Sequence, residues 1–405
     1  MSLHALFLDF NSYFASVEQQ DRPDLRNRPV AVVPVLAETT CCIAASHEAK
    51  KFGVKTGTRV SLARQMCPGI TIIEARPELY VQYHNRLKDL FESCMPIEEV
   101  LSIDEMWGEL TGRYTQEDEA IKLAHHIKDT IRKGIGSEMK CSIGIAPNRF
   151  LAKTASDMQK PDGLVVIRPE DLPDCLLPLR LRDFTGIGSN MIDRLHRHGI
   201  RTVSTLWNSS RESLAEVWGG IEGERFHAAL HGEKMPRTET KRASLGHSHV
   251  LPPDSRDRVK ALAVLHRLLQ KAAMRLRRMR YLTKGMHLSV RFTNQSKWSD
   301  ELRFTETKDS LQLTNHLNQL WKRLPASSPP PLLIGVTFAP LVKEEETTQV
   351  FFENPKCGKL DTAIDLLNER FGKNTVYFGG AFGALKSAPM RIAFNRIPDI
   401  STEGD

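Results

Sequence analysis

The stretch Leu8–Glu18, with the sequence LDFNSYFASVE, decides the interpretation of this chain together with Ser102–Glu105, with the sequence SIDE. Each stretch places a carboxylate at the end of an apolar run: Asp9 follows Leu6–Leu8, and Asp104 follows a similar run. Such runs are typical of buried strands. A carboxylate at the mouth of a buried strand is costly unless a cation neutralises it, and Mg²⁺ binds one or two carboxylates together with substrate phosphates. The two stretches therefore predict the halves of one metal site.

Each stretch alone has a simpler interpretation, which is a strand followed by the start of a helix. In that interpretation Asp9 is a helix cap, and Asp104 and Glu105 form a solvated strand end. The presence of both stretches in one chain, together with a third motif, favours the metal site.

The third motif is Ser156–Gly163, with the sequence SDMQKPDG. In order and spacing, the three motifs resemble those of the Y-family translesion DNA polymerases, and the bacterial polymerase IV group in particular. The resemblance runs from Met1 to about Phe352. Beyond it, the residues around Val376–Gly380 resemble the tail of the polymerase V catalytic subunit, and the sequence does not indicate their chemistry.

This resemblance implies a multidomain α/β and α+β fold shaped like a right hand. Residues 1–11 and 76–167 would form the catalytic palm, and residues 12–75 the fingers. A helical thumb with a helix-hairpin-helix would occupy residues 168–235, followed by a linker at 236–243, a little finger at 244–352 and a C-terminal extension at 353–405.

Hydrophobic periodicity gives a matching order of elements. In the first part of the chain, strands are predicted at residues 5–8, 30–33, 71–74, 99–103 and 142–145, and helices at 77–94, 117–133 and 148–158, with Asn148 as an N-cap. In the last part, strands are predicted at 288–292, 302–305 and 332–338, and helices at 256–278, 310–323 and 360–370.

The resemblance also assigns the catalytic residues. Asp9 and Asp104 would bridge two Mg²⁺ ions, for which Mn²⁺ could substitute, and Glu105 would complete the site facing the primer. The backbone carbonyl of Phe10 would serve the metal on the nucleotide side. Phe14 aligns with the steric gate that excludes a 2′-hydroxyl, whereas its neighbour Tyr13 has a simpler interpretation as a core aromatic residue.

Contacts to the nucleotide are where the chain departs from the family pattern. His47 replaces a Tyr, and Lys50 replaces an Arg that grips phosphate, which keeps the charge but loses bidentate geometry. Ala44 stands where a hydroxyl residue is usual, and Ile43 stands where a small residue is common. We expect a weaker hold on the nucleotide and an altered lesion spectrum. The nucleotide-binding residues implied by the resemblance are Asn11, Ser12, Tyr13, Phe14, Ala44, His47, Lys50 and Lys160.

Charge is distributed unevenly along the 405 residues, whose formal net charge is +7. Residues 241–323 contain 18 lysines and arginines against 6 aspartates and glutamates, so this stretch carries +12 and the rest of the chain −5. A basic segment in an otherwise slightly acidic protein is typical of nucleic-acid binding. A basic surface that only faces solvent would have the same number of charged residues. The resemblance identifies the nucleic-acid partner as primer-template DNA, with a dNTP as the second substrate.

Individual DNA contacts follow from this partner. Gly186 and Gly188 form a Gly-x-Gly hairpin that can approach a phosphate, although an ordinary tight turn has the same sequence. The little-finger residues expected on DNA phosphates are Lys271, Arg275, Arg277, Arg278, Arg280, Lys284 and Arg291. The segment Gln349, Val350, Phe351 and Phe352 resembles a peptide that binds the sliding clamp, and an edge strand is an alternative interpretation.

Other features limit the class of protein. The seven cysteines are odd in number and form no Cys-x-x-Cys pair, which favours reduced thiols over disulfides or a zinc site. No run of 18 apolar residues and no signal peptide are recognisable, so we expect no membrane partner and a location in the bacterial cytosol or nucleoid.

The sequence therefore predicts template-directed, error-prone translesion DNA synthesis by two-metal nucleotidyl transfer, as part of DNA repair and damage tolerance. Two alternatives remain open. A non-catalytic polymerase-like accessory protein would bind DNA or the clamp but would not need Asp9, Asp104 and Glu105. A two-metal nuclease would not need Phe14.

Overall fold

The structure is a computed structural model of the 405-residue chain. It describes residues 2–234, 242–346 and 355–398, except for positions 373, 386, 388, 389, 391, 393, 395 and 396, and it describes only the backbone of residues 355–358.

The palm is built on a five-stranded sheet with the order β5-β6-β1-β7-β8. The central strand β1 (Ala5–Phe10) is antiparallel to β6 (Glu105–Glu109) and to β7 (Cys141–Ala146), and β7 is parallel to β8 (Leu164–Val166). All six residues of β1 are buried, which explains why Asp9 is its one residue that is not apolar.

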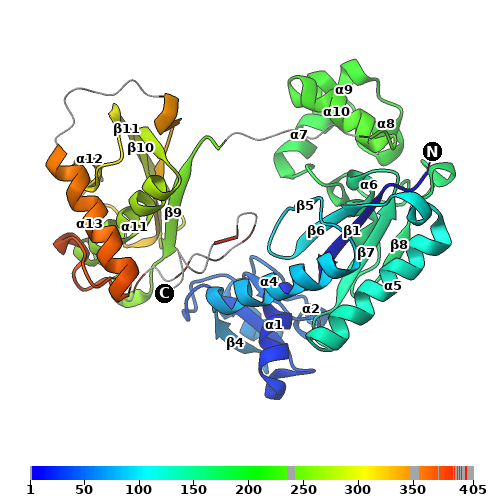
Figure 1. The fold of residues 1–405 in the computed structure, drawn as a ribbon, viewed down its shortest axis with the longest axis horizontal. Helices are drawn as coiled ribbons and strands as arrows, with labels where there is room; N and C mark the ends of the chain where they lie inside the picture. The colour runs from blue at the N-terminus through cyan, green and yellow to red at the C-terminus, as the bar shows by residue number, and fades with distance from the viewer. Residues whose placement is uncertain are drawn as a thin grey trace.

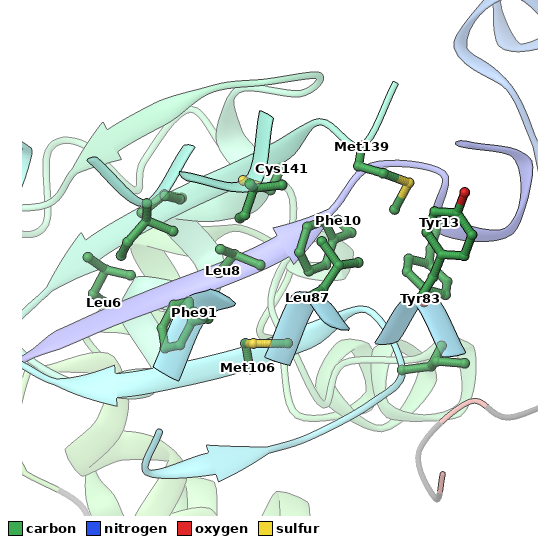
Figure 2. Packing of buried hydrophobic residues seen from close by; sticks show 14 of the residues in the cluster. Leu6, Leu8, Phe10, Tyr13, Tyr83, Leu87, Phe91, Met106, Met139 and Cys141 are labelled. Carbon is green, nitrogen blue, oxygen red and sulfur yellow. The ribbon is translucent and has the colours of Figure 1, made fainter. Parts of the chain in front are cut away.

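Helices cover both faces of this sheet. Alternate residues of β1, such as Leu6 and Leu8, pack with α4 (Pro77–Cys94) and α5 (Glu117–Gly134) in the core shown in Figure 2. The opposite face packs against α6 (Arg149–Met158). The predicted N-cap of α6 is confirmed, because the Asn148 side chain accepts a hydrogen bond from the Leu151 amide.

The predicted strand at residues 99–103 is wrong. Only β5 (Glu99–Val100) is extended, and residues 101–104 form a tight connection to β6 in which the amides of Leu101 and Ser102 both bond to the carbonyl of Glu105. Asp104 therefore lies in the turn between two strands, and Glu105 begins the second of them.

The fingers contain a small sheet with the order β3-β2-β4. Its strands are β2 (Val30–Val33), β3 (Ala44–Ala45) and β4 (Thr71–Glu74), and its helices are α1 (Tyr13–Asp21), α2 (His47–Lys51) and α3 (Val60–Met66). The strands predicted at residues 30–33 and 71–74 are confirmed.

The thumb consists of α7 (Ser189–Arg197), α8 (Val203–Trp207), α9 (Arg211–Trp218) and α10 (Ile221–Leu230). A 3₁₀ helix, η4 (Leu181–Asp183), precedes the Gly186 turn. The expected hairpin between two helices is thus a turn between a 3₁₀ helix and an α-helix.

The little finger is a four-stranded sheet with the order β11-β10-β12-β9, covered on one face by two helices. The strands are β9 (Leu245–Val250), β10 (Tyr281–Phe292), β11 (Lys297–Thr307) and β12 (Pro331–Phe338), with the short β13 (Leu341–Lys343) also paired to β10; the helices are α11 (Arg258–Arg278) and α12 (Ser310–Lys322). The two predicted helices are confirmed to within two residues. Strand β9 was not predicted, and β10 and β11 are much longer than expected.

The C-terminal extension folds onto the little finger. Its helix α13 (Pro355–Phe371) is followed by a 3₁₀ helix, η7 (Gly379–Ala381), that packs on α11. Figure 1 shows the thumb at one end of the palm, the fingers at the other, and the little finger as a separate body at the side. No helix among the described residues is long and apolar enough to cross a membrane.

Candidate active site

Strand pairing brings the predicted carboxylates together. Asp9 is the direct partner of Glu105 in the β1–β6 ladder, and the Asp104 carbonyl accepts a hydrogen bond of 2.9 Å from the Phe10 amide. The segments that the sequence suggested as two halves of one site therefore meet at the end of the central palm strand. Asp9 is 5% exposed, so its charge requires a partner.

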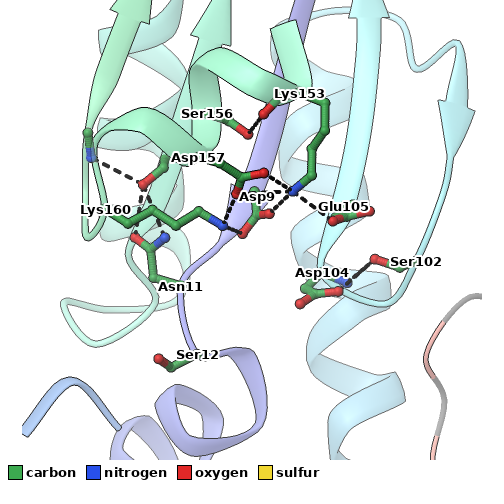
Figure 3. Close-up of polar contacts among 12 residues, drawn as sticks. Asp9, Asn11, Ser12, Ser102, Asp104, Glu105, Lys153, Ser156, Asp157 and Lys160 are labelled. Atoms are coloured by element: carbon green, nitrogen blue, oxygen red, sulfur yellow. Dashed lines mark hydrogen bonds and ion pairs between the residues drawn. The ribbon is translucent and has the colours of Figure 1, made fainter. Parts of the chain in front are cut away.

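Two lysines supply that partner (Figure 3). Lys153 Nζ is bonded to Asp9 Oδ2 and lies 2.9 Å from Glu105 Oε1, and Lys160 Nζ lies 2.8 Å from Asp9 Oδ1. Asp157 contacts both ammonium groups, at 3.2 and 2.7 Å. Burial opposes the charged form of Lys153, but the surrounding carboxylates raise its pKa above the ordinary value.

Lys153 and Asp157 were not predicted as site residues. Helix α6 can place them over the carboxylates because it packs directly on β7, where a Cβ at Gly144 would lie 2.0 Å from the Ala152 carbonyl oxygen. The sequence contains a signal for this approach, since Gly144 lies in the interior of a buried strand, where glycine often marks a close approach of another backbone.

Asp104 has a different environment from Asp9. Burial, followed by the negative charges of Asp9 and Glu105, raises the pKa of the Asp104 carboxyl group to about 6, although the Ser102 hydroxyl donates a hydrogen bond of 2.6 Å to it. Ion pairs of Asp104 with lysine or arginine do not occur among the residues that the structure describes. A cation placed here would relieve this unfavourable charge.

The donor set fits a hard divalent cation, because it consists of carboxylate oxygens at a strand end. Across the described positions, however, no three His, Cys, Asp or Glu side chains are arranged as a ready metal site. The Lys153 ammonium group lies between Asp9 and Glu105 (Figure 3). Binding of a cation between these two carboxylates would therefore require the Lys153 side chain to move.

Phe14 lies beside this site at the start of α1. Its ring is 4.8 Å from the Tyr80 ring, and its side chain is 4% exposed. Tyr13 is also buried and donates a hydrogen bond of 2.6 Å to the Tyr80 carbonyl. The Tyr13 side chain therefore belongs to the core, which agrees with its simpler interpretation.

The side chain of Asn11 is engaged within the protein. Its amide nitrogen donates to the Ser142 hydroxyl at 3.1 Å, and its carbonyl oxygen accepts from the Asp162 amide at 2.7 Å. Asn11 thus fixes the loop that follows Lys160, which is a positioning role that the sequence did not indicate.

Two of the remaining predicted nucleotide residues, Ser12 and Lys50, contact each other. Lys50 Nζ donates to the Ser12 hydroxyl at 2.7 Å, and partial burial together with the charge of Lys160 lowers the pKa of Lys50. His47 is exposed at the start of α2, whereas Ala44 is buried in β3. Lys50, Ser12 and Lys160 therefore form a group that could bind phosphate, with His47 at its edge.

The thumb turn has open space around both glycines. Gly186 has φ +89°, which favours glycine, and Gly188 precedes α7; a Cβ at either position would meet no atom within 4 Å. Both residues are exposed, so the turn leaves room for a phosphate backbone.

Several of the predicted DNA contacts in the little finger must be corrected. Arg277 bonds to Asp365 of α13 through two nitrogens at 2.7 and 2.8 Å, so its guanidinium group is occupied by the C-terminal extension. Lys271 is 8% exposed, and Arg275 bonds to His247 at 3.1 Å beneath the sheet. In contrast, Arg278, Arg280, Lys284 and Arg291 are exposed.

The face of the sheet opposite the helices carries further cations. In the antiparallel register of β10 and β11, Arg291 lies opposite Lys297, and Gly285 lies opposite Arg303. Lys297 and Arg303 are exposed and were not predicted. Exposed and partly buried residues alternate along β11. This period of two places Lys297 and Arg303 on one face, but it is informative only when the full length of the strand is known. The segment Gln349–Phe352 lies outside the described residues.

Comparisons with known proteins agree with this arrangement. Residues 8–157 match the model of the impB/mucB/samB family, and residues 242–350 match the model of the C-terminal domain of that family. DNA polymerase IV of Moorella thermoacetica is 32% identical over 92% of this chain and 94% of its own length. DNA polymerase IV 1 of Bacillus subtilis is 29% identical over 96% of this chain and 95% of its own length.

Solved structures agree as well. A Y-family DNA polymerase chimera of Dbh and Dpo4 has a TM-score of 0.70 and 25% identity, and the match covers 84% of this chain and 99% of the chimera. An insertion ternary complex of Dbh DNA polymerase has a TM-score of 0.55 and 26% identity, with the same coverage. The chain therefore belongs to the Y family of translesion DNA polymerases, among relatives that are named DNA polymerase IV.

Proposed function

We propose that Asp9, Asp104 and Glu105 bind two Mg²⁺ ions, with Mn²⁺ as a substitute, during template-directed DNA synthesis past damaged bases. The observation that carries the proposal is the pairing of Asp9 with Glu105 beside the half-buried Asp104. As a Y-family enzyme the chain is an error-prone DNA-directed DNA polymerase that depends on divalent metal and uses DNA and deoxynucleotides.

The bound ions would lower the pKa of the primer 3′-hydroxyl and polarise the triphosphate. The three carboxylates would hold the ions, and the Phe10 carbonyl would be a further ligand. Lys153, which neutralises Asp9 and Glu105 in the structure, moves away from the space between them. This exchange keeps the buried charges compensated at each stage.

The nucleotide is held by groups around the carboxylates. Lys50 and Lys160 bind the triphosphate as point charges, and Ser12 contributes its hydroxyl group. The Phe14 ring lies beneath the sugar and excludes a 2′-hydroxyl. His47 stands at the edge of this group and contacts the outermost phosphate.

The DNA duplex lies against the thumb turn and the open face of the little-finger sheet. Gly186 and Gly188 approach one phosphate backbone closely. Arg291, Lys297 and Arg303 contact the other phosphates on the duplex without reading sequence. Gln349–Phe352 bind the sliding clamp, and the enzyme acts on DNA in the bacterial cytosol.

Primer extension tests the proposal. With Mg²⁺ and dNTPs, Asp104→Asn and Glu105→Gln should each lower the extension rate by at least about a hundredfold, because the ions supply several kcal/mol of charge stabilisation. Glu109→Gln is the matched control, since Glu109 lies at the far end of the same strand and pairs with Lys234. Extension by Asp104→Asn at the wild-type rate would remove Asp104 from the metal site.

A further inference from the structure

The C-terminal extension is anchored to the little finger before it reaches any other domain. Asp361, which is 3% exposed, accepts a hydrogen bond of 2.9 Å from the Ser310 amide, and both Asp361 and Asp365 pair with Arg277. The Gln270 side chain donates to the Phe378 carbonyl at 3.2 Å. Ala384 is 2% exposed within the little-finger core. The extension is therefore held firmly as far as Ala384.

Beyond this anchor, the chain crosses to the palm and fingers. Met390 is 2% exposed and belongs to the core that contains β1 and α4. Ile392 and Ile397 pack against the same core. In Figure 1 the red end of the chain lies between the little finger and the palm. We call the residues Met390, Ile392, Phe394 and Ile397 the clasp.

Phe394 brings the clasp to the catalytic residues. Its carbonyl accepts a hydrogen bond of 2.8 Å from the amide of Ile103, the residue immediately before Asp104. Its ring lies edge-on to the Phe14 ring, with the centroids 5.7 Å apart and the planes at 77°. Phe394 therefore contacts both the turn that carries Asp104 and the aromatic ring proposed to select the sugar.

We propose that the clasp is an autoinhibitory contact. In the protein without substrates its Phe394 covers Phe14 and bonds to the turn that carries Asp104, and Phe394 must leave when a nucleotide places its sugar against Phe14. This inference rests on the proposed function of Phe14. A nucleotide that binds only the open state has an apparent affinity reduced by the fraction of molecules in which the clasp is closed.

The Phe394 end of the clasp is suited to release. Phe394 is 50% exposed, and among the described residues its carbonyl makes one backbone hydrogen bond to the palm. A half-exposed ring contact and a single neutral hydrogen bond are individually weak. The anchor on the little finger and the buried Met390 in the palm core stay in place, so the Phe394 end of the clasp can open and return without unfolding the extension.

Steady-state kinetics of the full chain test the proposal. Phe394→Ala should lower the KM for dNTP by about three- to tenfold with kcat unchanged, since one aromatic contact no longer competes with the sugar. Phe382→Ala is the matched control, because Phe382 lies in the same extension and is 79% exposed. An unchanged KM in Phe394→Ala, or an equal fall in both variants, would overturn the autoinhibitory role.

Two readouts separate the clasp from the proposed gate. The first readout is the ratio of kcat/KM for ribonucleotide to that for deoxyribonucleotide, which Phe394→Ala should leave unchanged. If Phe14 is not the steric gate, Phe14→Ala will leave this ratio unchanged as well, and that result would contradict the proposed function of Phe14. Independently of polymerase activity, p-benzoylphenylalanine at position 394 should photocrosslink to the peptide containing Phe14. Saturating primer-template and a non-hydrolysable dNTP should suppress that crosslink. A crosslink that persists at full yield with both substrates would contradict release, and no crosslink in the free protein would contradict closure.

Discussion

At the scale of single residues, the raised pKa of Asp104 links metal binding to pH. The carboxyl group is deprotonated only above about pH 6, because burial and the charges of Asp9 and Glu105 oppose its ionisation. A protonated carboxyl group cannot bind a cation, so the apparent Kd for Mg²⁺ should rise by about tenfold for each pH unit below 6. Calorimetric titration with Mg²⁺ between pH 5 and 8 measures this, and Asp104→Asn should abolish the part of the pH dependence centred near 6.

The raised pKa of Asp104 also predicts how the stability of the metal-free protein depends on pH. Because the pKa of Asp104 in the folded protein exceeds its ordinary value, the folded state binds more protons than the unfolded state between about pH 4 and 6. The contribution of Asp104 to stability therefore falls as pH rises through this window and stays unfavourable above it. Thermal unfolding in EDTA at pH 7.5 should show a higher Tm for Asp104→Asn than for the wild type. A lower Tm would mean that the ionised carboxylate is stabilised in the fold.

Sugar selection is also a property of one side chain. Phe14→Ala should raise the ratio of kcat/KM for ribonucleotide over deoxyribonucleotide by about a hundredfold, because the ring no longer excludes the 2′-hydroxyl. Tyr13→Phe is the control, since Tyr13 is buried and its hydroxyl bonds only to the Tyr80 carbonyl among the contacts found for it. An unchanged ratio in Phe14→Ala would place the gate elsewhere.

At the scale of elements, the docking of α13 on α11 depends on one guanidinium group. Arg277→Met should destabilise the extension by about 2–4 kcal/mol, because it leaves the buried Asp361 without its cation. Hydrogen exchange of α13 measures the effect. Arg278→Met, at the adjacent exposed position, should change exchange very little. Equal exchange in both variants would show that the ion pair does not hold the helix.

The open face of the little-finger sheet makes a separate prediction. Replacing Arg291 and Lys297 with Gln should reduce the slope of log K against log salt for primer-template binding by about two units, roughly one for each lost phosphate contact. Arg278→Gln is the control on the helical layer. A changed slope in the control together with an unchanged slope in the double variant would assign DNA binding to the helices.

The elements also show what the sequence could and could not predict. The apolar run before Asp9 located that carboxylate, because β1 is a buried strand with a clear local pattern. The run before Asp104 pointed to the right residue for a different reason, since residues 101–104 form a turn and not the predicted strand. The role of Arg277 had no such pattern, since its partners Asp361 and Asp365 lie far along the chain. Lys153 was missed for the same reason: a lysine in an amphipathic helix has the sequence of a surface residue until the strand that faces it is known.

At the scale of the whole molecule, the clasp belongs to a C-terminal extension whose contacts with the little finger hold it near Phe14. An intramolecular contact of this kind has an effective concentration set by the length of chain between anchor and target, here Met390 to Phe394, and short connections give values in the millimolar range. Its occupancy is therefore independent of the enzyme concentration. The balance between closed and open states is set by the strength of the Phe394 contacts and is shifted by the nucleotide and DNA present.

A free peptide with the sequence of the clasp lacks the high effective concentration of the tethered segment. A synthetic peptide with the sequence of residues 387–398, added to the Phe394→Ala variant, should raise its KM toward the wild-type value only at about millimolar concentration. The same peptide with Ala in place of Phe394 is the control. Inhibition at micromolar concentration would show that the segment binds tightly by itself, and the enzyme would then need another factor to release it before each encounter with damaged DNA.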